Sequence, residues 1–174
     1  NQTLDLAHVP VVFLSAKNST PDKVYGLHLG VEDYIAKPFE YEELLARVEG
    51  VIRRHEYYVD AAMKDGLLGI YNEVFFNKEI NVFFDIAKRY KTIFSLVIID
   101  LDGFQKINDT YGHRAGDFIL KQFCRIAEQM LRRADIFMRY GGDEFVIVMP
   151  ETNSLQAQKA VDKIKEFIKS KTFY

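Results

Sequence analysis

The sequence has little of what stabilises secreted proteins or anchors membrane proteins. Among its 174 residues there is a single cysteine, Cys124, so no disulfide framework can form within the chain. This cysteine lies in a helical apolar pattern, which fits a reducing cytoplasm. No apolar run approaches the ~18 to 20 residues of a membrane span, and no signal peptide is visible. We therefore expect a cytoplasmic protein without membrane insertion.

The sequence also lacks an excess of charge of one sign. Its 23 Lys and Arg residues and 25 Asp and Glu residues give a formal net charge of −2, which argues against a nucleic-acid partner held by bulk electrostatics. Hydrophobic residues make up 48% of the chain, enough for a sizeable core in one or two domains. No internal repeat or low-complexity segment is present. The chain does not begin with Met, and the motifs below lead us to expect a fragment truncated at both ends.

A glycine pair, Gly141-Gly142, lies between two apolar runs, and this pattern predicts a β-hairpin. Adjacent glycines can both adopt positive φ, as tight hairpin turns require. Asp143 and Glu144 follow at once, where a strand begins. Acidic residues beside a bare glycine turn suggest a place where a metal and a phosphate chain approach the backbone. An ordinary solvated hairpin tip is the alternative.

A second acidic stretch favours the metal hypothesis. Residues 94–99 predict a buried strand that leads directly into Asp100, Leu101 and Asp102, before a glycine and a new helix. Carboxylate oxygens suit Mg²⁺, which usually binds one or two carboxylates plus substrate phosphates. The free N–H groups that open the next helix can hold anions.

Three motifs in this order resemble the GGDEF family of diguanylate cyclases: residues 100–109, residues 111–117, and Gly-Gly-Asp-Glu-Phe at 141–145. The resemblance covers residues 65–174. It implies a reaction that condenses two GTP molecules to cyclic di-GMP plus pyrophosphate, by metal-assisted attack of a 3′-hydroxyl on an α-phosphate. Each domain would hold one GTP, so the resemblance implies a catalytic homodimer. It also implies a further strand and a later basic pair after Tyr174, so we expect this domain to be C-terminally incomplete.

The resemblance assigns roles to individual residues. Asp100, the Leu101 carbonyl and Asp143 would hold Mg²⁺ or Mn²⁺, while Asp143 and Glu144 would be catalytic. A carboxylate can accept the neighbouring N–H and amino group of guanine together, a pair that adenine does not offer. The positions that the resemblance places on the substrate are Phe104, Asn108, His113, Asp117, Gly141 and Gly142. The polar ones among them would otherwise be interpreted as turn or helix-cap residues.

The chain departs from the family pattern at two positions. The family usually has lysine after the phenylalanine of the first motif, where the cation can stabilise transition-state charge, but here Gln105 follows. The opening motif at 65–72 is usually followed by arginine, whereas Glu73 stands here. These departures favour the alternative hypothesis, a catalytically weak or inactive domain that acts as a sensor of GTP or cyclic di-GMP.

A product-binding site is implied as well. Arg132 and Asp135 form an Arg-x-x-Asp motif, with five residues between Asp135 and Gly141, as in the inhibitory site of the family. The planar fork of arginine suits phosphates and guanine edges. A charged helix end is the alternative interpretation of this motif.

The first part of the chain predicts an α/β unit with parallel strands at 9–14 and 33–36. A helix should start at Ser19-Thr20-Pro21. The unit resembles the second half of a response-regulator receiver domain, over residues 1–54. Ser15, Tyr34 and Lys37 match the switch residues of that family, and the bond from Lys37 to its proline is often cis. Lys37 alone could be a solvated strand-end lysine.

The acidic pair and the phospho-accepting aspartate of such domains lie earlier in the fold and are absent from this sequence. An upstream sensor kinase is thus expected to act through the missing half of the receiver. The same absence argues against a third hypothesis, a phosphotransfer relay protein.

A long helix is predicted from Tyr41 onward. A heptad seam of mainly apolar residues, with His55 as a tolerated polar one, follows a 3–4 spacing at Tyr41, Leu44, Val48, Val51, His55, Tyr58 and Ala62. This seam would pair with a second chain or pack on its own domain. We expect residues 55–64 to form a helical linker.

The complete pattern predicts an α/β (α+β) fold: a partial receiver-type parallel sheet, a long connecting helix, and a cyclase-like mixed sheet covered by helices. Amphipathic helices are predicted around 75–90, 119–130 and 157–168, with a short helix at 104–109.

Overall fold

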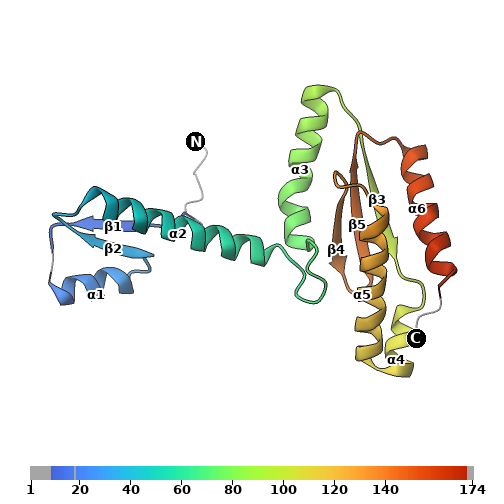
Figure 1. The fold of residues 1–174 in the computed structure, drawn as a ribbon, viewed down its shortest axis with the longest axis horizontal. Coiled ribbons are helices and arrows are strands. Elements are labelled where there is room, and N and C mark those ends of the chain that lie inside the picture. The colour runs from blue at the N-terminus through green and yellow to red at the C-terminus, as the bar shows by residue number, and fades with distance from the viewer. Residues whose placement is uncertain (1–8, 18, 172–174) are drawn as a thin grey trace. The chain divides into compact units, whose positions relative to one another are not determined.

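The computed structural model describes residues 9–17 and 19–171 (Figure 1). The chain divides into two compact units, residues 1–61 and 62–174. The outer ends of the predicted domains, residues 1–8 and 172–174, lie outside the described residues. The predicted mixed α/β fold is confirmed, with a parallel pair of strands in the first unit and an antiparallel sheet in the second.

The first unit contains β1 (Val12–Ser15), α1 (Thr20–His28), β2 (Asp33–Ala36) and most of α2 (Tyr41–Ala62). Strands β1 and β2 pair in parallel, as predicted. The Ser19 side chain caps α1 by accepting a hydrogen bond from the Asp22 N–H. Helix α1 packs on β2 at Gly26, where an added Cβ would lie 2.7 Å from the Tyr34 ring. A larger residue at this position would push the tyrosine aside.

Helix α2 is held to β2 by Arg47. Its guanidinium donates to Glu43 at 2.9 Å and to Asp33 at 3.1 Å, and both hydrogen bonds raise its pKa. Along the predicted seam, Val51 is only 3% exposed, whereas Tyr41 and Tyr58 are 69% and 68% exposed. Val51 in the middle of the seam is therefore buried, whereas Tyr41 and Tyr58 present their side chains to solvent.

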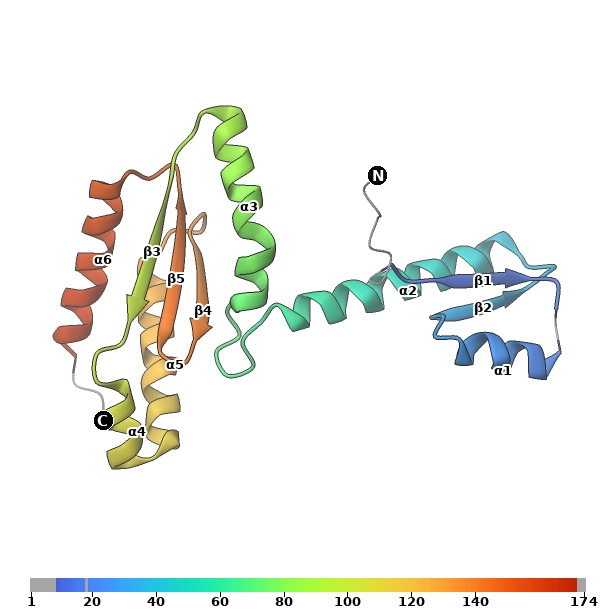
Figure 2. The same cartoon turned by 180° about the vertical axis from the view of Figure 1, so that it is seen from behind.

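The second unit contains α3 (Glu73–Tyr90), β3 (Phe94–Asp100), α4 (Phe104–Tyr111), α5 (His113–Met130), β4 (Ile136–Gly141), β5 (Glu144–Pro150) and α6 (Ser154–Lys169). Its sheet has the order β3-β5-β4, with both pairings antiparallel. Figures 1 and 2 show α3 on one face of this sheet and α5 and α6 on the other.

The central strand β5 explains this layered arrangement. Five consecutive residues, 145–149, are buried, because helices cover both faces of the strand. Phe145, Ile147 and Met149 pack with the α5 and α6 side chains. Val146 and Val148 point to the other face, where phenylalanines of α3 cover them.

Cys124 belongs to the larger core, where it is 4% exposed. Burial is the main cause that raises the pKa of this thiol to about 12. The thiolate form is therefore scarce at neutral pH, and the cysteine acts as a small apolar core residue.

The prediction that residues 94–99 form a buried strand was only half right. β3 lies at the edge of the described sheet, and its side chains alternate between covered and exposed. Ile98 is 72% exposed and Leu96 41% exposed, because α3 packs over β4 and leaves this part of the face uncovered. Across residues 9–17 and 19–171, no helix combines the length and apolar character needed to cross a membrane.

Candidate functional site

The tip of the β4–β5 hairpin carries the Gly-Gly-Asp-Glu segment. Gly141 ends β4 and pairs with Glu144, so the turn itself consists of Gly142 and Asp143. Only Gly142 has positive φ, at 43°, and the expectation of positive φ at both glycines is therefore wrong. A Cβ added at either glycine would meet no atom within 4 Å. The backbone at this tip is open to an approaching ligand.

The register of the β3–β5 ladder brings two acidic residues together. Asp100, the last residue of β3, lies directly opposite Glu144, the first residue of β5. Directly opposed residues of an antiparallel pair point to the same face, and like charges there repel each other. A cation bound between these two carboxylates would remove that repulsion.

Asp143 is joined to the same strand end through its backbone. The Leu101 N–H donates to the Asp143 carbonyl at 3.3 Å. The three residues that were predicted to hold the metal, Asp100, Leu101 and Asp143, thus lie at one end of the ladder. Within the described residues no group of three or more His, Cys, Asp or Glu side chains is arranged so that it could hold a metal ion. Few carboxylates plus a carbonyl suit Mg²⁺, which keeps open positions for water and phosphate oxygens.

Asn108 and Asp117 are brought together by the contact between α4 and α5. The Asn108 Oδ1 atom is buried without a hydrogen-bond partner in the described structure. A Cβ added at Gly116, the neighbour of Asp117, would lie 1.9 Å from this oxygen. The glycine therefore allows α4 and α5 to approach closely at the residue that precedes the exposed Asp117.

The remaining predicted substrate residues differ in exposure. Phe104 is 9% exposed and belongs to the core, and its N–H already donates to the Leu101 carbonyl. His113 begins α5 and is exposed. Phe104 can therefore shape the site through its ring, while His113 is accessible from solvent.

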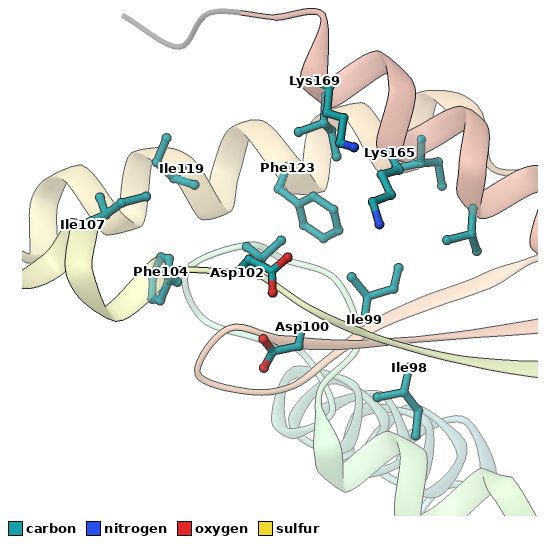
Figure 3. A pocket seen from close by; sticks show the side chains of 14 residues that line it. Ile98, Ile99, Asp100, Asp102, Phe104, Ile107, Ile119, Phe123, Lys165 and Lys169 are labelled. Carbon is teal, nitrogen blue, oxygen red and sulfur yellow. The ribbon is translucent and has the colours of Figure 1, made fainter.

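A pocket of about 580 Å³ adjoins the end of β3. Its walls are mainly apolar side chains of β3, α4, α5 and α6, including Phe104 and Phe123. Figure 3 shows Asp100 and Asp102 at the β3 side of this pocket, and Lys165 pointing into it from α6. Lys169 lines the pocket too. The carboxylates and ammonium groups make the two sides of this pocket opposite in charge.

Arg132 and Asp135 lie in the turn before β4. The Asp135 carboxylate accepts the Arg132 backbone N–H at 2.8 Å, and the Asp135 N–H donates to the Arg132 carbonyl at 2.9 Å. The aspartate therefore shapes the turn, and the exposed arginine side chain remains available to a ligand.

In the first unit, Ser15 is the last residue of β1, and Lys37 comes directly after the parallel neighbour strand β2. The Lys37 N–H donates to the Ser15 carbonyl at 2.7 Å, and the peptide bond from Lys37 to Pro38 is cis. The Tyr34 hydroxyl donates to the Lys17 carbonyl at 2.7 Å. The three predicted switch residues thus gather at the carboxyl end of this strand pair.

Sequence reasoning missed the partners of Arg139. This side chain donates to the Gly142 carbonyl in the turn and to Asp65, which lies 74 residues away in sequence. A cation four residues before Asp143 was the available signal, but nothing local indicates its acidic partner. Lys165 and Lys169 were missed because lysines on an amphipathic helix are ordinarily solvated.

Residues 62–174, which contain this site, match the family model described as diguanylate cyclase, GGDEF domain. The chain belongs to the GGDEF family. The match covers the whole second unit, including the hairpin tip and the end of β3.

Among curated relatives, the response regulator PleD of Caulobacter vibrioides is 30% identical over 175 residues, covering 95% of this chain and 38% of that protein. Diguanylate cyclase DgcS of Shewanella oneidensis is 41% identical over 88 residues, covering 51% of this chain and 30% of that protein. This GGDEF chain therefore spans 38% or less of the length of these relatives.

Among solved structures, the coiled coil and GGDEF domain of DgcB from Caulobacter crescentus, in complex with c-di-GMP, matches with a TM-score of 0.65. The identity is 25%, and the match covers 71% of this chain and 64% of that chain. Diguanylate cyclase SiaD of Pseudomonas aeruginosa, at 24% identity and a TM-score of 0.62, shares the fold.

We expect Gly116→Ala to disturb the α4–α5 contact, because the new methyl would overlap the Asn108 Oδ1 atom. The free energy of unfolding should fall by about 1–3 kcal/mol, as in other overpacked cores. Urea denaturation measures this change, and Gly50→Ala in α2 is a matched control because its nearest neighbour is a flexible arginine end 3.6 Å away. An unchanged midpoint for Gly116→Ala would show that the two helices are not in close contact.

Proposed function

We propose that the protein is a response-regulator diguanylate cyclase that condenses two GTP molecules to cyclic di-GMP plus pyrophosphate. The observation that carries this proposal is the junction of Asp100, Leu101, Asp143 and Glu144 at one end of the β3–β5 ladder. Membership of the GGDEF family and relatives with diguanylate cyclase in their names support it.

In the proposed reaction, Asp100, the Leu101 carbonyl and Asp143 are the groups that would hold Mg²⁺ or Mn²⁺. The metal supplies charge neutralisation at the α-phosphate when it is bound. Asp143 accepts the proton of the attacking 3′-hydroxyl, and Glu144 supports the metal from the opposite strand. The open glycine backbone at the hairpin tip leaves space for the triphosphate.

Guanine is proposed to bind where α4 and α5 meet. The exposed Asp117 carboxylate can accept the N–H and amino group of guanine together, and Asn108, whose Oδ1 is buried against Gly116 without a partner, is proposed to contact the base through its side-chain amide. His113 is exposed at the start of α5, and the ring of Phe104 packs beside Gly116 and offers an apolar surface.

Each GGDEF domain would hold one GTP, so two copies must face each other during catalysis. The exposed tyrosines at both ends of the α2 seam are available for contact with a second chain. We propose residues 1–54 as the second half of a receiver domain, 55–64 as a helical linker, and a sensor kinase as the upstream partner. The gathering of Ser15, Tyr34 and Lys37, together with the match to a response regulator over 95% of the chain, supports this.

A second candidate function is a sensor that binds GTP or cyclic di-GMP without turnover. Gln105 favours it, because a neutral amide cannot stabilise the negative charge that develops in phosphoryl transfer. The intact carboxylates at the end of the β3–β5 ladder oppose it.

We expect the purified protein to form cyclic di-GMP from GTP and Mg²⁺, with a rate that rises more than linearly with protein concentration because two domains must meet. Asp143→Asn should lower the rate about 10²-fold or more, since the proton acceptor and a metal ligand are lost. Chromatography of the products measures both effects.

Asp85→Asn, an exposed carboxylate on α3, is the matched control and should leave the rate unchanged. If no product forms and either GTP or cyclic di-GMP binds tightly, the cyclase hypothesis is rejected in favour of the sensor hypothesis. Equal rates for Asp143→Asn and the control would contradict the assigned role of Asp143.

Product inhibition through Arg132 and Asp135 is part of the same proposal. Arg132→Ala should raise the cyclic di-GMP concentration that halves the rate by about tenfold, because the phosphates lose a charged donor. Arg133→Ala is the matched control, an exposed neighbour on the same turn. Inhibition that is equally strong in both variants would place the inhibitory site elsewhere.

A further inference from the structure

Arg139 connects the hairpin turn to a distant loop. Its Nε and Nη2 atoms donate to the Gly142 carbonyl at 2.9 and 2.6 Å. Its Nη1 atom donates to the Asp65 Oδ2 at 3.0 Å. Both side chains of this ion pair are only 17% exposed, so water screens it less than a surface pair. Charge-assisted hydrogen bonds of a fixed guanidinium fork restrict geometry as well as adding energy.

The Gly142 carbonyl belongs to the peptide group that leads into Asp143. Arg139 therefore fixes the plane of the peptide bond on the N-terminal side of Asp143. On the C-terminal side, the Asp143 carbonyl accepts the Leu101 N–H at 3.3 Å. Hydrogen bonds therefore hold the peptide groups on both sides of Asp143. Without Arg139, the peptide group between Gly142 and Asp143 would lose both hydrogen bonds to its carbonyl.

Asp65 is itself rigidly placed. Its Oδ1 accepts the N–H groups of Leu67 and Leu68 at 3.0 and 2.8 Å, so only Oδ2 is left for Arg139. The backbone of Asp65 donates to Ile70 and accepts from Gly69, both at 2.8 Å. A loop closed by four hydrogen bonds cannot shift its carboxylate without breaking them.

The Asp65 loop is also tied to β4 beside Arg139. The Arg139 N–H donates to the Tyr71 carbonyl at 2.9 Å, and Tyr71 forms a parallel bridge with Met138. The arginine thus contacts the loop through both its backbone and its side chain. This double attachment fixes where the guanidinium meets the turn.

We propose that Arg139, held by Asp65, is a positioning residue that orients the Gly142–Asp143 peptide and so keeps Asp143 at the end of the β3–β5 ladder, where Asp100 pairs with Glu144. Its effect on catalysis rests on the proposed cyclase function, whereas its effect on the turn does not. The hypothesis separates two tasks. Asp143 carries the chemistry, and Arg139 determines where Asp143 lies.

The test compares Arg139→Ala, Arg139→Lys and Asp65→Asn with an Arg125→Ala control, an exposed arginine of α5. Amide hydrogen exchange reports on the turn. Exchange at Leu101, whose N–H donates to the Asp143 carbonyl, should become about 10- to 100-fold faster in Arg139→Ala, while residues 146–148 in the sheet keep their protection. The control should match the unmodified protein at Leu101 and in this segment.

Kinetics report on catalysis. Arg139→Ala should lower kcat about 10- to 100-fold, because a misplacement of about 1 Å costs this much, while KM for GTP changes less than about threefold. Arg139→Lys keeps the charge but loses the contact of two nitrogen atoms with the Gly142 carbonyl. Compared with Arg139→Ala, it should therefore recover more of the melting temperature than of kcat. Asp65→Asn should lower kcat in the normal background and have no further effect in Arg139→Ala.

Uniformly faster exchange across the sheet, with kcat falling only in proportion to folded protein, would overturn the proposal in favour of a purely structural ion pair. Additive effects of the Asp65 and Arg139 substitutions would overturn it as well. A protein without cyclase activity would contradict the proposed function, yet the exchange measurement would still decide whether Arg139 fixes the turn.

Discussion

The antiparallel ladder between β3 and β5 is the constraint on which the candidate site depends. Its register runs without a shift from the pair Phe94–Pro150 to the pair Asp100–Glu144. A slip by one residue would exchange the β5 side chains that face α3 with those that face α5 and α6, and it would also separate the two carboxylates. The hydrophobic core and the acidic site are therefore specified by the same pairing, and the burial on both faces of β5 stabilises a geometry that brings like charges together.

The proposed GTP site has two ends, the β4–β5 hairpin tip and the α4–α5 contact, and different interactions form each of them. At the hairpin, one carbonyl is held by Arg139 and the next by the Leu101 N–H. At the α4–α5 contact, the absence of a side chain at Gly116 allows Asn108 to approach. Hydrogen bonds to the backbone thus position the turn that carries Asp143, whereas a glycine leaves the Asn108 Oδ1 atom without a partner at the α4–α5 contact.

The sequence allowed the helices, the hairpin and the acidic residues to be predicted, because apolar periodicity and glycine pairs are local signals. It did not reveal that Asp100 lies opposite Glu144, since register depends on strands that are far apart in the chain. The pairing of Arg139 with Asp65 was missed for the same reason. The exposure of Ile98 was missed because an apolar run shows neither which strand lies at an edge nor which helix covers it.

The most direct test of the account is the binding of a non-hydrolysable GTP analogue, measured by calorimetry with and without Mg²⁺. The account predicts binding that Mg²⁺ strengthens about tenfold or more, an enhancement lost in Asp100→Asn because the ladder end then lacks a metal ligand. Asp162→Asn on α6 should retain it. Equal affinity with and without Mg²⁺, or an enhancement that survives in Asp100→Asn, would contradict the claim that this end of the ladder holds the metal with the nucleotide.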